Sequence, residues 1–310
     1  MLPYIEPGQR VGIGSRRINL HCAGAGNGGP TVVLMAGLFS WSLVWYKTQP
    51  VIAQHARVCA FDRASYGFSD PAPRPQIVSE VIEDLHKALR AASIPGPYVL
   101  VGHSLGGLEA RIYAQRWPQE VAGMVLVDTS PAGEGLLDES QPAFDDAAGR
   151  ESYAADMMHC ASLAARGVLE SSSTDFKECS AALPRDTPAA VRGKLPQLLT
   201  APYFEAKVSL ISSLYTHRYD SADHQSLGAM PLVVLSIEHP WTSATPAGVR
   251  LDREYGKVWN EMHLALSRLS SRGVHRLIKG SGHHIQLDQP QAVVDAVDDV
   301  LHLVRSDAQP

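Results

Sequence analysis

The chain has 310 residues, of which 45% are hydrophobic and 19% charged, and its formal net charge is −5. A chain of this length and composition can bury a large core in one α/β domain, or in one domain that carries an insertion. It has no block of lysine and arginine and no apolar run close to the roughly 20 residues of a membrane helix. We therefore expect neither a nucleic-acid partner nor a membrane span.

The first 131 residues alternate between predicted strands and predicted helices. Strands are expected twice within residues 9–22 and then at Thr31–Met35, Val58–Phe61, Val99–Val101 and Gly123–Val127. Helices are expected within Ser42–Gln54, over the amphipathic stretch Ile77–Ala92 and from Leu108 onward. Asp62, directly after its strand, is interpreted as a turn residue that ties down its own loop. This alternation predicts a doubly wound, mostly parallel sheet with right-handed crossovers.

The alternation stops between residues 132 and 228, where short apolar segments separated by serine and proline predict several short helices. It resumes with a strand at Leu232–Ser236 and a helix at Asp252–Leu269, whose expected buried face includes Val258 and Trp259. A last strand at Val274–Ile278 and a closing helix at Pro290–Arg305 follow. We expect a core domain of residues 1–131 and 229–310 and a helical insertion over 132–228.

One stretch, Tyr98–Gly107, has the pattern of a catalytic turn. Its apolar run ends at Gly102-His103-Ser104-Leu105-Gly106, and a helical sequence follows. Strand, Gly-x-Ser-x-Gly and helix in this order form the context of a nucleophile elbow. A side chain at either glycine would collide with the neighbouring backbone, and Ser104 would be held strained and exposed above the sheet. The Leu105 N–H would lie at a helix N-terminus, which favours negative charge.

These residues and three further segments resemble the α/β-hydrolase superfamily. Leu34-Met35-Ala36-Gly37-Leu38 is similar to the family's oxyanion loop, Phe61 to Ser69 to its Asp-Arg turn, and Gly280-Ser281-Gly282-His283 to its histidine loop. The resemblance implies an eight-stranded sheet and a cap, formed by the insertion, over the active site. It also implies an oxyanion hole made by the backbone N–H groups of Leu38 and Leu105.

The family's order of serine, acid and histidine implies the partners of Ser104. His283, directly after Gly282, is the expected base, and its neighbour His284 is the alternative. Many relatives carry their acid just after the strand that is Leu232–Ser236 here, but that position is occupied by proline. Other relatives place the acid after the strand that follows the elbow helix, where this chain has Asp128. We favour Asp128 over Glu238, and a loop-anchoring role for Asp128 stays open.

The resemblance implies a cofactor-independent serine hydrolase, with a carboxylesterase acting on small to medium apolar esters as the first expectation. A lactonase, an amidase, a carbon–carbon hydrolase, an acyltransferase or a non-catalytic ligand receptor would carry the same residues. No histidine, cysteine or carboxylate spacing predicts a metal site. Several large apolar side chains are candidates for a substrate pocket, with core packing as the alternative for each: Trp41, Trp45, Met158, Tyr203, Phe204 and Trp241.

The four cysteines leave the compartment open. Cys22 and Cys59 lie in predicted strands and are expected to be buried thiols. Cys160 and Cys179 lie nineteen residues apart in the insertion, where a disulfide is one of two readings and would argue for export. The first residues lack the basic and apolar regions of a signal peptide. The sequence gives no oligomeric state.

Overall fold

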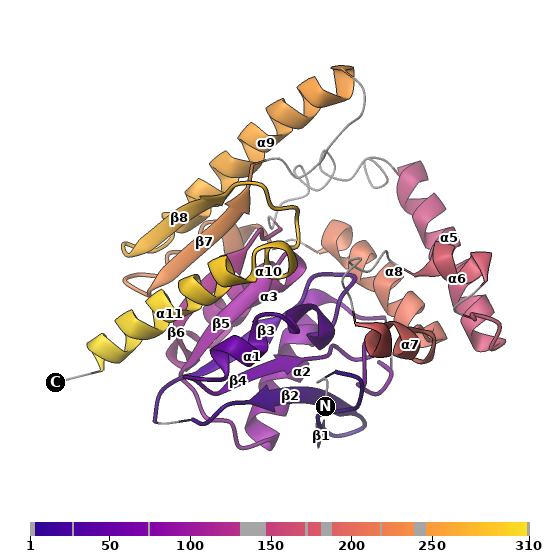
Figure 1. Cartoon of the computed structure of the whole chain (residues 1–310), viewed down its shortest axis with the longest axis horizontal. Coiled ribbons are helices and arrows are strands. Elements are labelled where there is room, and N and C mark those ends of the chain that lie inside the picture. The colour runs from indigo at the N-terminus through magenta and orange to yellow at the C-terminus, as the bar shows by residue number, and fades with distance from the viewer. Residues whose placement is uncertain are drawn as a thin grey trace.

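The computed structural model has one sheet of eight strands, in the order β1-β2-β4-β3-β5-β6-β7-β8 (Figure 1). The strands are β1 (Gln9–Gly12), β2 (Arg17–Ala23), β3 (Thr31–Met35), β4 (Val58–Phe61), β5 (Tyr98–His103), β6 (Val121–Val127), β7 (Leu232–Ile237) and β8 (Gly273–Ile278). β2 pairs antiparallel with β1 and β4, and every other neighbouring pair is parallel. This sheet confirms the predicted fold class.

The structure describes residues 4–26, 28–73, 75–130, 147–170, 173–180, 188–217, 219–238 and 246–308. Its α-helices are α1 (Gln49–Ile52), α2 (Val78–Ala91), α3 (Leu105–Arg116), α5 (Ala147–Ala165), α6 (Thr174–Cys179), α7 (Ala189–Leu198), α8 (Ala201–Thr216), α9 (Pro246–Ser267), α10 (Ile285–Asp288) and α11 (Pro290–Asp307). Short 3₁₀ turns lie at η1 (Ser42–Trp45), η2 (Pro118–Glu120) and η4 (Asp220–Asp223).

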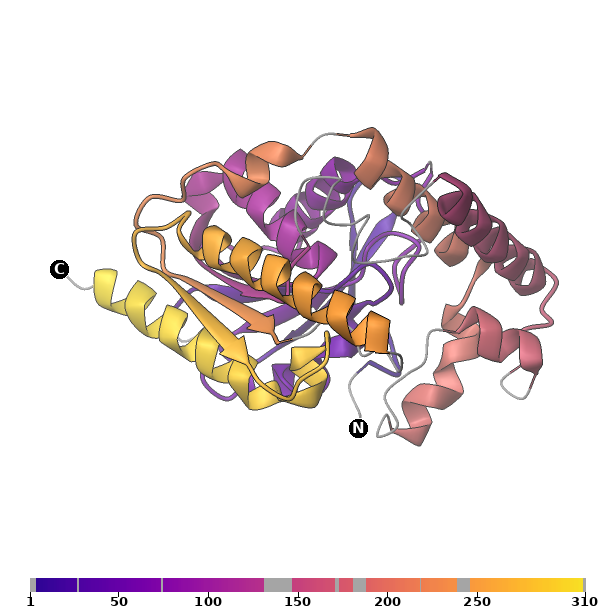
Figure 2. The same cartoon turned by 90° about the horizontal axis from the view of Figure 1, so that it is seen from above.

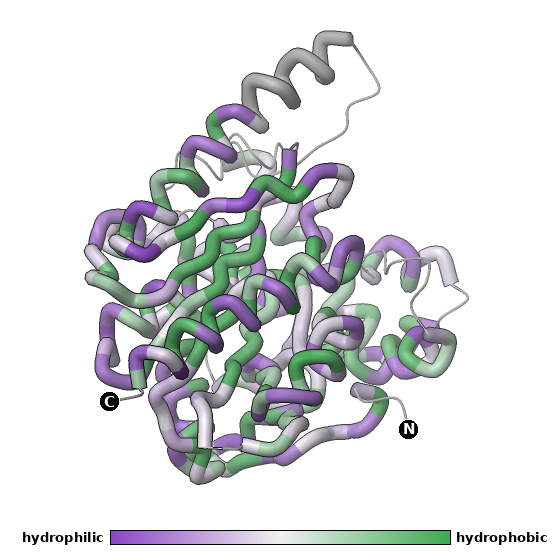
Figure 3. The backbone as a smooth tube through the Cα atoms, turned by 60° about the vertical axis from the view of Figure 1, so that its left-hand side comes forward, coloured by the Kyte–Doolittle hydropathy of each residue, from purple (hydrophilic) through white to green (hydrophobic). Residues whose placement is uncertain are grey.

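The sheet buries side chains on both faces, because successive residues of a strand point to opposite sides. On β3, Val33 and Met35 join the core under α2, α3 and α9, whereas Val32 and Leu34 join the core under α1 and α11. Figure 2 shows α11 and α9 on opposite sides of the strands, and Figure 3 shows the central strands as a hydrophobic band. The helices on the two faces hold the sheet between them, and the carboxyl ends of its parallel strands lie along the same side.

Most strand bounds agree with the sequence prediction to within two residues, but helix α9 corrects one expectation. Val258 was expected on its buried face and is instead 40% exposed. In the part of the helix whose side chains are described, the buried stripe includes Trp259, His263 and Leu266, and Val258 lies outside it. The short helix α10 was not predicted, since four residues are too few for a helical period to be read.

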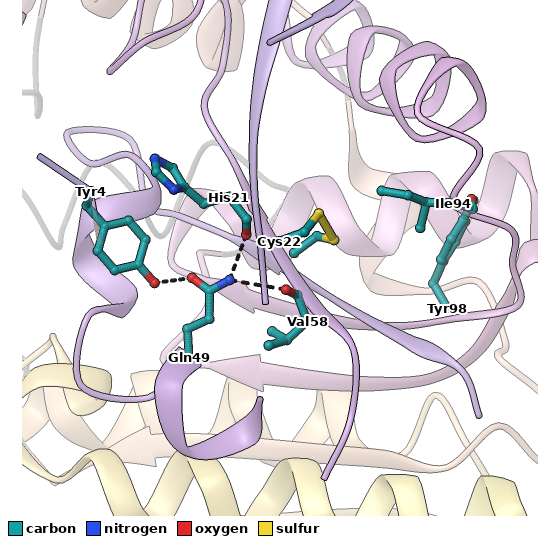
Figure 4. Close-up of a disulfide and its surroundings, with 8 residues drawn as sticks. Tyr4, His21, Cys22, Gln49, Val58, Ile94 and Tyr98 are labelled. Atoms are coloured by element: carbon teal, nitrogen blue, oxygen red, sulfur yellow. Dashed lines mark hydrogen bonds between the residues drawn. A yellow bond between two sulfur atoms is a disulfide. The ribbon is translucent and has the colours of Figure 1, made fainter. Parts of the chain in front are cut away.

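Cys22 and Cys59 form a disulfide, which corrects the expectation of two buried thiols (Figure 4). Strands β2 and β4 are antiparallel neighbours, and their register places the two cysteines directly opposite each other. Beside the disulfide, the amide of Gln49 donates hydrogen bonds to the carbonyls of His21 and Val58, at 2.6 and 3.2 Å, and accepts one from the Tyr4 hydroxyl. Strands β2 and β4 are therefore held together here by a covalent bond as well as by side-chain hydrogen bonds.

Helices α5 to α8 lie between β6 and β7 in the chain and gather together at one side of the sheet (Figure 1). Cys160 of α5 and Cys179 of α6 form a second disulfide. Helix α8 packs on the loops that follow β3 and β4, where the ring of Tyr203 meets Trp41 at 5.9 Å and Tyr66 at 5.0 Å between centroids. Among the helices of the described residues, none has the length and apolar character to cross a membrane.

Candidate active site

Ser104 occupies the sharp turn between β5 and α3, with a φ of 52° and a ψ of −122°. Positive φ is costly for a residue with a side chain and persists only where the surroundings enforce it. A Cβ on Gly102 would lie 2.3 Å from the carbonyl oxygen of Gly106, and one on Gly106 would lie 2.2 Å from that of Met35. Both glycines are thus required by close backbone approach, as the pattern predicted.

The loop after β6 holds this turn from the other side. The carbonyl of Ser104 accepts hydrogen bonds from the N–H of Ser130, at 3.1 Å, and from the hydroxyl of Thr129, at 3.2 Å. The Oγ of Ser104 lies 3.3 Å from the Oγ of Ser130. Within the described residues, the Ser104 hydroxyl is hydrogen-bonded to Ser130 and not to His283.

Asp128 and His283 meet at the same edge of the sheet. The Nδ1–H of His283, in the loop after β8, donates to Oδ2 of Asp128 at 2.6 Å. The second oxygen, Oδ1, accepts from the indole N–H of Trp259 at 2.8 Å and from the backbone N–H of Ile237 at 3.3 Å. Asp128 is fully buried, and the His283 side chain is 27% exposed. With Nδ1 engaged by the carboxylate, Nε2 of His283 carries the free lone pair.

The surroundings of Asp128 favour its ionised form. Burial by itself would raise the pKa of the carboxyl group, but the hydrogen bond and charge of His283, with help from His263 and Trp259, hold the pKa below its ordinary value. The Nε2 of His263 lies 3.8 Å from Oδ1, and its ring donates from Nδ1 to the carbonyl of Trp259 at 2.8 Å. Asp128 is therefore an anion at neutral pH, which suits a group that orients an imidazole.

His103, next to Ser104 in the sequence, turns away from the serine and supports the histidine loop. Its Nε2–H donates to the backbone carbonyl of His283 at 2.9 Å, and the two rings lie 4.6 Å apart between centroids. Burial, followed by the neighbouring His283 and His284, lowers the pKa of His103 well below its ordinary value. A neutral His103 leaves His283 free to take up a proton without a second cation beside it.

The loop after β3 approaches Ser104 closely and is fixed by a buried arginine. A Cβ on Gly37 would lie 3.2 Å from the Cβ of Ser104. The guanidinium of Arg63 donates to the carbonyls of Ala36, Gly37 and Ser40 and pairs with both carboxylate oxygens of Glu109 on α3, at 2.7 and 2.8 Å. Arg63 therefore fixes the backbone of the loop that lies against Ser104.

The N–H of Leu38 follows Gly37 in this loop, and the N–H of Leu105 begins helix α3. Within the described chain, neither N–H donates a hydrogen bond to another protein group. An oxyanion hole requires backbone N–H groups that are free of protein partners, and these two N–H groups meet that requirement.

The expected pocket residues divide into four groups. Trp41, Tyr203 and Phe204 pack together between the loop after β3 and helix α8. Trp45 follows its core-packing alternative, because it lies on the α1 and α11 face of the sheet, opposite the face on which Trp41 packs. Met158 is 47% exposed on α5, since the inward stripe of that helix carries Met157. Trp241 lies outside the described residues.

Glu238 and His284, the alternatives to Asp128 and His283, lie in different surroundings. Among the described residues, the Glu238 carboxylate makes no hydrogen bond to His283, whereas the backbone carbonyl of Glu238 accepts a 3.4 Å hydrogen bond from Asn260. The ring of His284 faces His103, at 4.9 Å between centroids, rather than Asp128. Of the two neighbouring histidines, His283 is the one that meets a carboxylate.

Three site residues were not identified from the sequence. Trp259 was expected only on the buried face of its helix, and His263 was not singled out, although both face Asp128. Ser130, the partner of the Ser104 hydroxyl, lies two residues after Asp128, and its position in the strand-end loop was the available signal. No group of three or more His, Cys, Asp or Glu side chains in the described residues is arranged to hold a metal ion.

Residues 30–157 match the sequence model of the alpha/beta hydrolase fold. The uncharacterized protein YqjL of Bacillus subtilis is 24% identical over 276 residues, which cover 89% of this chain and 85% of YqjL. An uncharacterized protein of Schizosaccharomyces pombe is 41% identical over 93 residues, or 30% of this chain, but only 17% of its own length is matched. The uncharacterized protein YbdG of Bacillus subtilis, 27% identical over 124 residues, is matched over 39% of this chain and 37% of its own length.

Two solved structures extend the likeness to the whole chain. An esterase from Thermogutta terrifontis has a TM-score of 0.66 and 19% identity, with 96% of this chain and 99% of the esterase covered. A hydrolase from Pseudomonas aeruginosa PA01 has a TM-score of 0.61 and 20% identity, with 94% and 97% covered. At these identities the likeness concerns the fold. Together with the strand order and the strained serine turn, these matches show that the chain has the α/β-hydrolase fold.

Proposed function

We propose that this chain is a serine hydrolase that cleaves carboxylic esters without a cofactor. The observation that carries the proposal is the 2.6 Å hydrogen bond between buried Asp128 and His283, at the sheet edge where Ser104 stands in a strained turn. A nucleophilic serine needs a base, and that base needs a group to orient it. The anion of Asp128 fixes the proton of His283 on Nδ1 and leaves Nε2 to act as the base.

In the proposed reaction, Ser104 rotates about its Cα–Cβ bond and exchanges the Ser130 hydroxyl for Nε2 of His283. Catalytic hydrogen bonds are often long or absent without substrate and tighten in the complex. Oγ attacks the ester carbonyl as its proton passes to Nε2, and the N–H groups of Leu38 and Leu105 receive the developing oxyanion. The proton then goes to the leaving alkoxide, which gives an alcohol and an acyl-enzyme.

Water resolves the acyl-enzyme by the same route in reverse. His283 takes a proton from water, the hydroxide attacks the acyl carbonyl, and the proton returns to Ser104 Oγ as the acid leaves. Asp128 stays ionised throughout and stabilises the imidazolium that forms twice in the cycle. No metal or redox group takes part in any of these steps.

We also propose that helices α5 to α8 act as a cap and supply part of the substrate pocket. The support is the packing of Tyr203 on Trp41 and Tyr66, which places α8 directly over the loops after β3 and β4. The ring of Tyr203, with Phe204 packed against it, would then form the apolar wall that small to medium acyl chains contact. The domain division of residues 1–131 with 229–310 and 132–228 follows from this proposal.

The two disulfides favour an oxidising compartment as the place of action. Disulfides persist in secreted and periplasmic proteins and are rare where thiols are kept reduced. Cys22 pairs with Cys59 and Cys160 with Cys179, so the two pairs account for all four cysteines of the chain.

Labelling with a fluorophosphonate and turnover of 4-nitrophenyl butyrate test the proposal together. The purified chain should hydrolyse the ester and gain one adduct, on the peptide that carries Ser104. Ser104→Ala should lose the adduct and more than about 99.9% of the turnover, whereas Ser130→Ala, with the neighbouring hydroxyl removed, should keep the adduct. An adduct on Ser130, or turnover that survives in Ser104→Ala, would refute the mechanism. Ligand binding without turnover would point to a receptor.

A further inference from the structure

Helix α8 carries a buried lysine that has no acidic partner among the described residues. Lys207 is only 4% exposed, yet in the described chain its ammonium group makes no hydrogen bond and no ion pair. Lysine is almost never buried unless it is paired, because removing an ammonium group from water is costly. A methionine would fill the same space without that cost, so the charge at this position calls for a partner that arrives from outside the protein.

Four aromatic rings surround the ammonium group. Its nitrogen lies 4.9 Å from the ring centroid of Phe39, 5.3 Å from Tyr203, 5.6 Å from Phe204 and 5.8 Å from Tyr153. The negative faces of such rings stabilise a cation and compensate part of its lost hydration. We call Lys207 and these four rings the lysine cage. Desolvation by burial still lowers the pKa of Lys207 to about 8, which leaves it mostly charged at neutral pH.

The lysine cage lies beside the proposed reaction centre. Phe39 directly follows Leu38 and stands two residues after Gly37, so the α-carbons of Phe39 and Gly37 are no more than about 8 Å apart. Gly37 in turn lies against Ser104. The hydroxyl of Tyr203 donates to the Phe39 carbonyl at 3.3 Å, which fixes the cage to the loop. Phe39 and Tyr153 are themselves partly exposed, so part of the cage lies at the surface.

We propose that Lys207 binds a carboxylate of the substrate, so that the enzyme prefers esters that carry a second, anionic group near the scissile bond. This inference rests on the proposed esterase function and narrows its substrate class. A carboxylate entering the cage would meet a cation that is already poorly hydrated, in surroundings where opposite charges attract more strongly than in water. The aromatic walls would contact the methylene groups of the same substrate.

Paired esters test the proposal on the full chain. Monoethyl glutarate and ethyl pentanoate differ by a carboxylate on the acyl side, and O-butyryl glycolate and ethyl butyrate differ by one on the alcohol side. The proton released on hydrolysis gives kcat/KM for each. The wild type should favour the anionic member of at least one pair. Lys207→Met should lower that ratio about thirtyfold, and Lys207→Arg should restore part of it.

Lys257→Met is the matched control, because it removes one positive charge from a well-exposed side chain of α9. It should leave the anionic-to-neutral ratio unchanged. A melting curve of each variant separates misfolding from lost recognition, and Lys207→Arg keeps the test open if Lys207→Met does not fold. The inference would be overturned if the wild type hydrolysed neutral esters as well as anionic ones, or if Lys207→Met kept the wild-type ratio of anionic to neutral kcat/KM. Either result would leave the esterase proposal intact.

Glutarate binding provides a readout without turnover. Millimolar glutarate should raise the melting temperature of the wild type and of Lys257→Met, and should not raise that of Lys207→Met. If the wild type cleaves no ester but binds glutarate through Lys207, the esterase proposal fails while the anion site stands. If glutarate stabilises neither the wild type nor Lys207→Arg, the anion site is refuted.

Discussion

Asp128→Asn is the substitution that probes the proposed mechanism most directly. The carboxylate accepts hydrogen bonds from three donors, at 2.6 Å from His283, 2.8 Å from Trp259 and 3.3 Å from Ile237. Asparagine has the same shape but only one oxygen, so its amide nitrogen must face one of these donors. When it faces His283, Nδ1 becomes the acceptor and the proton moves to Nε2, the atom that has to act as the base.

The loss follows from that change of tautomer and from the missing negative charge. In serine proteases the corresponding substitution costs about 10⁴ in kcat, and we expect 10³ to 10⁴ here. At about 1.4 kcal/mol for each factor of ten, this is roughly 4 to 5.5 kcal/mol of transition-state stabilisation. Steady-state hydrolysis of 4-nitrophenyl butyrate at neutral pH measures it, and a melting curve checks that the variant is folded.

Glu238→Gln is the control for this prediction. Its carboxylate also leaves the end of a core strand, and within the described residues it makes no hydrogen bond to His283, so kcat should stay within about threefold of the wild type. A larger loss in Glu238→Gln than in Asp128→Asn would assign the acid to Glu238. Retention of more than a tenth of the wild-type kcat in Asp128→Asn would refute the assignment of Asp128.

Three further substitutions or conditions test the surroundings of the site. Arg63→Met should lower the free energy of unfolding in urea by about 3–5 kcal/mol, because it leaves the buried carboxylate of Glu109 unpaired. The double variant Arg63→Met with Glu109→Leu should lose less, and a double variant as unstable as the single one would contradict this. Burial outweighs the attraction of the Asp128 carboxylate and lowers the pKa of His263 to about 4, so the unfolded chain binds its proton below pH 6.5 while the folded chain does not. Stability should therefore fall as the pH drops from 6.5 toward 4, and His263→Asn should flatten that part of the profile measured by urea unfolding. Cys160→Ser with Cys179→Ser should lower the free energy of unfolding by about 3 kcal/mol, and an unchanged urea midpoint would show that this bridge does not form.

The parts of the structure that depend on local sequence could be predicted. Strands Thr31–Met35 and Val58–Phe61 occur as predicted, because short apolar runs between turn signals leave little freedom. The turn at Ser104 follows from the spacing of Gly102 and Gly106, where close backbone approach admits no side chain. Asp62 is a loop anchor as expected, since its oxygens accept from Asn19, Ser42 and Phe68.

The parts that depend on tertiary packing could not be predicted. Trp259 donates to Asp128 across 131 positions, and no periodicity reports that contact. Trp41 and Trp45 lie in one short stretch, yet a 3₁₀ turn sends them to opposite faces of the sheet. The Cys22–Cys59 bridge follows from the pairing of β2 with β4, which requires the strand order. Lys207 would be read as a solvent-exposed charge from composition alone, because nothing in its helix signals the rings around it.

Helix α3 limits how the substrate range of this protein could be changed by mutation. Glu109 reaches the loop after β3 through Arg63, and Arg111, two residues on, donates to Thr129, Ser130 and Asp223 at 2.8 Å each. A single helix therefore positions the loops on both sides of Ser104. The charges of Glu109 and Arg111 cannot be replaced singly, because each replacement would leave a buried or partly buried partner without its opposite charge. Mutant libraries aimed at a new substrate range should leave α3 untouched and vary α8 instead, apart from Tyr203, whose hydroxyl holds the Phe39 carbonyl.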